Sequence, residues 1–401
     1  MQPLHAQEAN SNLITNILNS NSATFKPILT NLENNRLQLL FTQIKSDKKG
    51  NPQFTHHHFN TEKAGYFYPA STVKLPIALL ALQRLKELNI DGLNRNTTFI
   101  TLQNGDGQTA VHNDPSALDG RPTIAHYIKK ILLVSDNDAY NRLYEFLGQD
   151  YIHTALKKMG YSDVRIVHRL ELSLTESQNK HTNPIRFLDA DGNIIYQQPA
   201  RYSQFSPTPT PITLGKGYYK NGILIQAPFD FSAKNRLPLT DLHQMLMSII
   251  CPLSVDKKKR FNITEDDYAF IQKYMSMTPL ESASPLYQEP AYWDNYVKFL
   301  YYGAEKVTPD SSVRIYNKVG DAYGFLIDAA YIVDYKNNVA FFLSAALLCN
   351  SDEIFNDDNY DYDTVGFPFL KALGKAIYQY ELTQVSDNKK TLTPIVSNYK
   401  N

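Results

Sequence analysis

The chain has 401 residues, of which 43% are hydrophobic and 20% are charged, the balance of a globular protein with a substantial core. Forty basic side chains (Lys and Arg) match forty acidic ones, and this zero net charge gives no electrostatic argument for binding nucleic acid or an anionic membrane. No run of 18 apolar residues is present, so no transmembrane helix is expected. The length suggests about two domains, or one large composite domain. Cys251 and Cys349 fit buried thiols, with a single disulfide left open.

The N-terminal region combines a helical pattern with two strands. Apolar positions at helical spacing within 9–35 predict a helix that breaks near Pro27, and residues 36–47 are typical of a strand. A turn at "DKKGN" leads to a partner strand over 53–60, which contains three consecutive histidines. Alternate residues of a strand face opposite ways, so these histidines cannot bind one metal ion together, and a structural or solvated role is expected.

The middle of the chain has several predicted helices up to residue 161 and an irregular segment over 176–235. Helices are predicted over 71–88, in two segments within 123–148 and over 150–161, with Gly148 as a C-cap. Residues 176–235 are rich in Pro, Tyr, Thr and Asn, and only 186–198 looks regular, as a hairpin around Asp-Gly. Such a stretch is usually a lid or disordered. Its aromatic residues either line a cleft or form a small satellite core: Tyr202, Phe205, Tyr218 and Tyr219.

The last part of the chain returns to strands. Helices are predicted over 239–251, 264–275 and 291–303, then strands over 313–320, 324–335 and 338–348, then a helix over 366–382. This order favours an α+β fold, in which both chain ends (1–65 and 305–401) build an antiparallel sheet flanked by helices. Residues 66–304 form an inserted all-helical domain that contains the irregular segment 176–235.

Ser71 and Lys74 open the first central helix, in "YPASTVKLPIALL". Residues three apart share one helical face, so the two side chains are neighbours. A serine hydroxyl needs an adjacent base to act as a nucleophile, and a helix N-terminus favours developing negative charge. A capping serine beside a solvated lysine is the alternative interpretation.

Two further motifs follow in order, Ser135-Asp136-Asn137 between helices and Lys318-Val319-Gly320 on a strand. SxxK, SDN and KTG occur together in class A β-lactamases and penicillin-binding proteins. The chain therefore resembles the serine β-lactamase and penicillin-binding protein superfamily, and is closest to class A. The resemblance implies the β-lactamase/transpeptidase-like fold.

A fourth segment, "RLELSLT" over 169–175, resembles the Arg-x-Glu-x-x-Leu-Asn signature of the class A omega loop. Glu171 would then be the base that activates water for deacylation. Thr175 stands where the family has asparagine, and Glu176 is a rival for the role of base. An ordinary surface glutamate is the alternative for Glu171.

The resemblance also implies a role for each matched residue. Ser71 would be the acylated nucleophile, with Lys74 taking its proton or sharing that work with Glu171. Ser135 would relay a proton to the leaving nitrogen. The remaining residues would bind substrate. Asn137 would do so through its amide, and Lys318 would hold Ser135 and present positive charge. Gly320 and Asp321 would belong to the strand that contacts the substrate. The backbone N–H groups of Ser71 and Asp321 would form the oxyanion hole, and Asp136 would order its loop.

Two departures concern the carboxylate of a β-lactam. Val319 replaces the hydroxyl residue of the third motif, which removes a hydrogen bond of roughly 1–3 kcal/mol. No supporting arginine is evident on the next strand, and Asp328 near that place is expected to repel an anion. The acidic segment 356–366 lacks the glycine and glutamate of a calcium loop, so a solvated loop is favoured.

These observations predict a serine hydrolase that needs no metal or cofactor, most simply a class A-like β-lactamase. One alternative is a DD-peptidase-like hydrolase acting on another amide or ester, such as a peptidoglycan peptide. Another is a penicillin-recognising sensor without turnover. The expected partner is a small β-lactam or peptide-like substrate rather than nucleic acid. A periplasmic or secreted location is implied by the resemblance alone, because the N-terminus shows no signal peptide.

Overall fold

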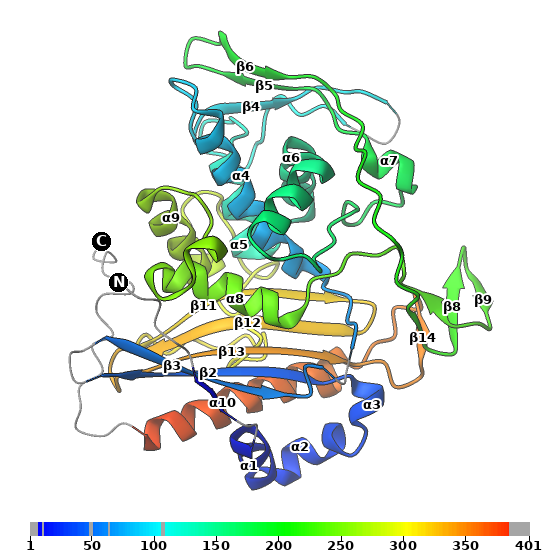
Figure 1. Ribbon diagram of the computed structural model, residues 1–401, viewed down its shortest axis with the longest axis vertical. Helices are drawn as coiled ribbons and strands as arrows, with labels where there is room; N and C mark the ends of the chain where they lie inside the picture. The colour runs from blue at the N-terminus through cyan, green and yellow to red at the C-terminus, as the bar shows by residue number, and fades with distance from the viewer. Residues whose placement is uncertain (1–6, 10–11, 48–50, 63–64, 106–108, 385–401) are drawn as a thin grey trace. The chain divides into compact units, whose positions relative to one another are not determined.

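The computed structural model describes residues 7–9, 12–47, 51–62, 65–105 and 109–384 (Figure 1). The chain divides into two compact units. The first consists of Met1–Thr72, Pro209–Arg260 and Asp294–Asn401, and the second of Val73–Thr208 and Phe261–Trp293. Residues 209–260 and 294–304, which the sequence pattern assigned to the helical domain, therefore cluster with the sheet.

The first unit is built on a six-stranded sheet in the order β1-β3-β2-β13-β12-β11. These strands are β1 (Gln7–Ala9), β2 (Gln38–Ser46), β3 (Pro52–Phe59), β11 (Val313–Ala322), β12 (Phe325–Asp334) and β13 (Val339–Leu348). All pairs are antiparallel except β1 with β3. Strands from both chain ends thus form one antiparallel sheet, which confirms the expected α+β fold.

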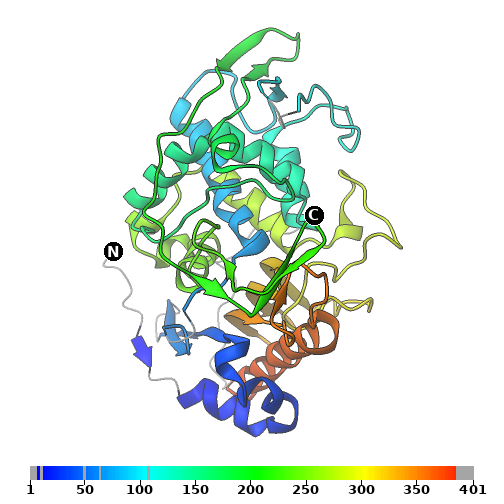
Figure 2. The same ribbon diagram turned by 90° about the vertical axis from the view of Figure 1, so that its right-hand side faces the viewer.

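Helices cover both faces of this sheet. Helix α10 (Phe367–Thr383) packs on β13, beside α1 (Asn12–Ser20) and α2 (Ser22–Leu29), as both views show (Figures 1 and 2). The other face carries α8 (Leu239–Ile250), which contacts β12 and β13. The short α3 (Leu32–Asn35) leads into β2. The expected break at Pro27 is wrong, because α2 continues through it to Leu29.

The predicted helix over 291–303 does not form. Turns replace it, with Tyr301 and Ala304 at positive φ. The backbone finds side-chain partners outside a helix: Asn295 donates to the carbonyl oxygens of Glu305 and Val307, and the Leu300 N–H donates to Asp328. Local apolar spacing was misleading here because these buried polar contacts are made with residues distant in sequence.

The second unit is mainly helical. It contains α4 (Lys74–Leu88), α5 (Ile124–Val134), α6 (Asn137–Lys158), α7 (Glu176–Lys180) and α9 (Glu265–Ser276). Gly148 has φ 69° and a non-helical backbone that divides α6 into two helical parts, so it ends the first as predicted. A three-stranded sheet of β4 (Thr98–Thr101), β5 (Ile185–Leu188) and β6 (Ile194–Gln198) includes the predicted Asp-Gly hairpin.

The segment 176–235 is ordered and contributes to both units. Besides α7, β5 and β6 it contains β7 (Thr213–Leu214), β8 (Gly217–Lys220), β9 (Ile223–Ile225) and β10 (Phe229–Asp230). Strand β8 pairs with β9 and with β14 (Ile354–Phe355), and β10 pairs with β7. Short strands far apart in sequence therefore give the segment its order.

Candidate active site

Ser71 lies in a short 3-10 turn, η1 (Ala70–Val73), that leads directly into α4. The turn is closed by Thr72, whose N–H and hydroxyl both donate to the carbonyl oxygen of Pro69, at 3.0 and 2.6 Å. Ala70 has φ 47°, a left-handed conformation that bends the chain just before Ser71. Ser71 is half-buried, whereas the first ten residues of α4 (74–83) are all buried, which anchors the start of the helix.

Lys74 is fully buried at the start of α4 and is surrounded by acceptors from the second motif. Its Nζ donates to Asn137 Oδ1 at 2.6 Å and to Ser135 Oγ at 3.2 Å. It also donates to the Ser135 carbonyl oxygen. An unpaired buried ammonium would be very costly, and these contacts compensate for the lost water. The structure therefore brings together Lys74, Ser135 and Asn137, three of the residues selected from the sequence.

The geometry of Ser135 explains how its motif reaches Lys74. Ser135 has φ 61° and ends α5 in the left-handed conformation, with its N–H bonded to Ile131 O. Asp136 then starts α6, accepting the N–H of Ala139 at 2.7 Å, and lies 3.6 Å from Lys130 Nζ. Asp136 thus orders the turn, the role expected for it.

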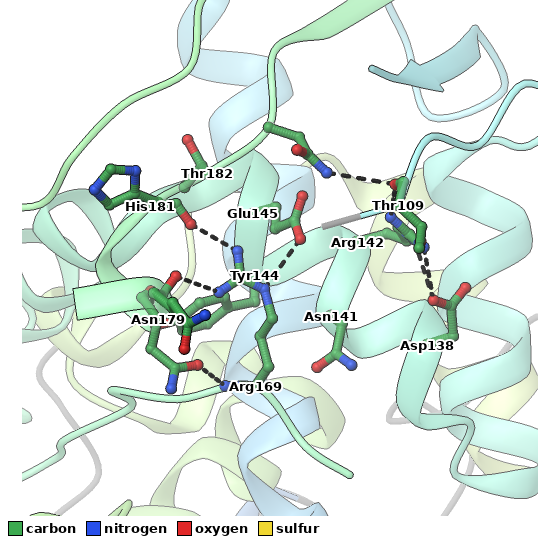
Figure 3. A network of polar contacts seen from close by, with 12 residues as sticks. Thr109, Asp138, Asn141, Arg142, Tyr144, Glu145, Arg169, Asn179, His181 and Thr182 are labelled. Carbon is green, nitrogen blue, oxygen red and sulfur yellow. Dashed lines mark hydrogen bonds and ion pairs between the residues drawn. The ribbon is translucent and has the colours of Figure 1, made fainter. Parts of the chain in front are cut away.

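Arg169 holds the loop that contains Glu171 (Figure 3). Its guanidinium donates to Glu145 on α6 at 3.0 Å, and the two side chains are 1% and 4% exposed. It also donates to the carbonyl oxygens of Gln178 and His181, at 3.2 and 2.7 Å, and lies over the Tyr144 ring. One buried side chain therefore joins α6, the loop and the end of α7.

Asn141 holds the residue next to Glu171. Its side-chain amide exchanges two hydrogen bonds with the backbone of Leu170, at 2.9 and 3.0 Å, as a strand partner would. Asn137, Asn141 and Glu145 are spaced by four residues, so they lie on one face of α6. Asn141 and Glu145 were not predicted from the sequence, although polar residues at this spacing along an apolar helix were a usable signal.

Glu171 itself is exposed and has φ 58°. Its left-handed backbone is strained for a residue other than glycine. It lies between Leu170, which Asn141 holds, and the capping box that Thr175 forms with Gln178 at the start of α7. The rival Glu176 is paired 2.8 Å from Lys180, and its side chain is 73% exposed. Thr175, which replaces an expected asparagine, therefore serves as a helix cap.

The third motif lies on β11, whose only described strand partner is β12. Gly320 packs directly on the turn of Ser71: a Cβ at this position would lie 2.8 Å from Ser71 N and 2.9 Å from both Pro69 O and Thr72 N. Only glycine permits this approach of two backbones. Lys318 is buried, and its Nζ donates to Val319 O at 2.9 Å. Asp321 follows Gly320 and is exposed.

Val319 and Asp328 are cross-strand partners, and both are buried. Val319 belongs to the apolar core that includes α10. Asp328 accepts the Leu300 N–H and the side-chain amide of Asn317, each at 2.9 Å. The expectation that Asp328 would repel a substrate anion is therefore wrong, since its carboxylate is enclosed in the core. Burial raises its pKa to about 7, although hydrogen bonds and the charges of Lys298 and Lys318 oppose this.

Three of the four aromatic residues singled out in 176–235 pack against another ring, and the fourth, Tyr219, is exposed. Phe205 stacks on His153 with centroids 3.5 Å apart, Tyr202 contacts His181, and Tyr218 packs edge-on against Phe229. These contacts fit the small satellite cores better than the walls of a cleft.

Three simpler expectations concern metals, thiols and membranes. The described part of the chain has no group of three or more His, Cys, Asp or Glu residues that could hold a metal ion. The histidines of β3 alternate as predicted: His57 bonds Gln43, whereas His56 bonds Thr42. Both cysteines are free and buried. No helix within the described ranges is long and apolar enough to cross a membrane.

Comparison with known proteins concerns the fold. The sequence matches the model of a family described as the beta-lactamase enzyme family over residues 22–194. A beta-lactamase from Xanthomonas campestris pv. campestris has a similar structure, with TM-score 0.51 and 12% identity over 92% of this chain and 97% of that one. A PBP-A variant, described as an acyl-enzyme complex with penicillin G, is also similar in structure. Its TM-score is 0.50 and its identity 12%, over 95% of this chain and 100% of that one. No curated protein sequence matches the chain.

Proposed function

Since this chain shares the fold of the serine β-lactamases and penicillin-binding proteins, as its motifs suggested, we propose that it is a serine hydrolase acting through an acyl-enzyme on Ser71. The observation that carries the proposal is the environment of Lys74. A fully buried lysine, bonded to Ser135 and Asn137, begins the helix that directly follows the turn of Ser71.

In the proposed acylation, Ser71 Oγ attacks the carbonyl carbon of an amide. Lys74, acting as the neutral amine, takes the serine proton, alone or with Glu171 through water, and the backbone N–H groups of Ser71 and Asp321 bind the oxyanion. As the C–N bond breaks, Ser135 passes a proton to the departing nitrogen. Asn137 and Lys318 would bind the substrate. No step requires a metal ion or cofactor.

In the proposed deacylation, Glu171 takes a proton from a water molecule whose oxygen attacks the acyl carbonyl carbon. The bond to Ser71 Oγ then breaks and the serine recovers its proton. The way Asn141 holds Leu170 supports this assignment, because it fixes the chain directly beside Glu171, one helical turn along α6 from Asn137. This step favours a class A-like β-lactamase, and a periplasmic or secreted location would suit it.

Val319 supports a second candidate, a hydrolase of another amide or ester such as a peptidoglycan peptide. Its side chain is buried in the apolar core and offers no hydroxyl to a β-lactam carboxylate. A sensor that is acylated without turnover is a third candidate. In such a protein Glu171 would have no role in deacylation.

Intact-protein mass, followed over time after addition of a penicillin, tests these candidates. An adduct that appears and decays while the drug is consumed is expected, and Ser71→Ala should form none. Glu171→Gln should accumulate adduct. A persistent adduct on the unmodified protein would favour a sensor. Absence of any adduct would reject β-lactams as substrates, and turnover by Ser71→Ala at the normal rate would reject the nucleophile.

A further inference from the structure

Three polar side chains are buried in the core behind the strand that carries Lys318. Asp328 is fully buried, and Asn317 and Lys298 are each 3% exposed. Asn317 directly precedes Lys318 on β11, Asp328 lies opposite Val319 on β12, and Lys298 comes from the irregular segment before β11. None of the three has a part in the proposed chemistry.

The hydrogen bonds of this group connect three chain segments. Asp328 Oδ1 accepts from Asn317 Nδ2 and its Oδ2 accepts from Leu300 N, both at 2.9 Å. Lys298 Nζ donates to Asn317 Oδ1 at 2.8 Å and to the backbone oxygen of Ile315 at 2.9 Å. Asn317 Nδ2 also donates to Val297 O at 2.8 Å. Strand β11 is thus fastened at Ile315 and at Asn317 to the segment 297–300.

Fastening matters for β11 more than for the inner strands. Among the described strands only β12 pairs with it, whereas β12 and β13 each have a neighbour on both sides. Three residues beyond Asn317, Gly320 packs against the backbone of Ser71 with no room for a Cβ. A small displacement of β11 would therefore reach the turn of Ser71 directly.

Stability alone does not account for a buried charged group. Removing charges from water costs about as much as their attraction returns, so apolar side chains of similar volume would hold the core as well or better. In some proteins a buried polar network instead selects one register and one position for the elements that it joins.

We propose that Asp328, Asn317 and Lys298 form a clamp that positions residues 318–321 of β11 for acyl transfer at Ser71. The catalytic part of this statement rests on the proposed function. The three residues are positioning residues, since they act through the strand and not on the substrate.

Hydrogen exchange followed by mass spectrometry tests the clamp without any substrate. Asp328→Ala removes both acceptors, whereas Asp328→Asn keeps the shape and one acceptor oxygen. The matched control is Asp334→Asn, on the same face of β12: Asp334 is also buried and accepts from Tyr378 and Asn337, both at 2.7 Å. If Asp328→Ala does not fold, Asp328→Asn and Lys298→Met provide the comparison.

We expect Asp328→Ala to speed exchange at least tenfold in peptides covering 313–322 and 66–72, with Asp328→Asn intermediate. Peptides of β13 should be unchanged, and Asp334→Asn should not affect residues 318–321. A uniform rise across the sheet would mean that Asp328 contributes only to global stability and would overturn the proposal. So would unchanged exchange in β11.

The acylation rate tests the catalytic part. It should fall about tenfold in Asp328→Ala, less in Asp328→Asn, and less than twofold in Asp334→Asn. A normal rate in a variant whose β11 exchanges faster would reject the link to catalysis. If the unmodified protein forms no adduct with a penicillin, the β-lactam assignment fails, and the exchange comparison still decides whether the clamp exists.

Discussion

The loop that carries Glu171 and the strand that carries Lys318 are held in place by different means. The loop has no ladder of backbone hydrogen bonds, so side chains of α6 supply its partners: Asn141 to Leu170 and Glu145 to Arg169. The strand has a continuous ladder to β12 and a backbone contact at Gly320. The loop should therefore be sensitive to the loss of side-chain atoms, and the strand to added atoms and to changes in the charges behind it.

Glu145→Ala gives the largest expected effect, because it leaves the Arg169 charge buried without its carboxylate. Breaking such a pair costs about 3–5 kcal/mol in the free energy of unfolding. Chemical denaturation measures this loss. Asp138→Ala is the matched control: Asp138 pairs with Arg142 on the same helix, but its side chain is 56% exposed, so a loss of less than about 1 kcal/mol is expected. Equal losses in the two variants would contradict the inference that the buried pair of Glu145 and Arg169 holds the loop.

The pH dependence of stability should report Asp328. Its pKa is raised from 3.8 to about 7 by burial, so the folded chain holds a proton that the unfolded chain has lost between about pH 4 and pH 7. The contribution of Asp328 to the free energy of unfolding therefore falls as pH rises through this range, by about 2–4 kcal/mol. Asp328→Asn should remove this component from denaturation curves measured at several pH values. An unchanged pH profile would show that Asp328 does not titrate there.

Gly320→Ala tests the backbone contact of the strand. The added Cβ would meet only backbone atoms, which cannot move aside as a flexible side chain would. Because displacement of about 1 Å near reacting groups can cost about 100-fold in rate, a similar loss in the acylation rate is expected. Stopped-flow or mass measurements of adduct formation give this rate. Acylation within a few-fold of normal would mean that β11 tolerates displacement at this point.

Thr175→Ala gives the smallest expected effect and tests how much the cap of α7 contributes to holding the loop that carries Glu171. It removes the cap of α7 while leaving Asn141 and Glu145 in place, at a cost of about 1 kcal/mol. Thr264→Ala, which removes a similar capping box from α9, is the control and should cost the same in thermal or chemical unfolding. A much larger loss in Thr175→Ala would show that the cap, rather than the α6 side chains, holds the loop.

Several features followed from local patterns alone. The helix after Ser71, the end of a helix at Gly148, the Asp-Gly hairpin and the three strands of the C-terminal region all formed as predicted. Their signals are periodic apolar residues and turn residues, which act over a few positions. The roles assigned to Ser71, Glu171 and Lys318 stay predictions, whereas the contact of Lys74 with Ser135 and Asn137 is now a structural observation.

Other features depended on residues far apart in the chain. Residues 291–303 have a helical pattern, yet their polar groups bond to Asp328 and to the carbonyl oxygens of Glu305 and Val307. Asp328 itself was expected beside a substrate and lies in the core. The spacing of residues along one segment cannot show which polar group on another segment will form a hydrogen bond with it. That partner depends on how the sheet and its connections pack.

The sequence by itself determined the order of the motifs, the superfamily resemblance and the sheet built from both chain ends, because each rests on residue types at short, fixed spacings. Only the tertiary structure decided that Asn141 and Glu145 hold the loop of Glu171, that Gly320 packs on the turn of Ser71, and that buried Asp328 accepts a hydrogen bond from Asn317 on β11. These contacts join residues up to hundreds of positions apart. Burial makes them specific, since a polar group removed from water must find its partner within the fold.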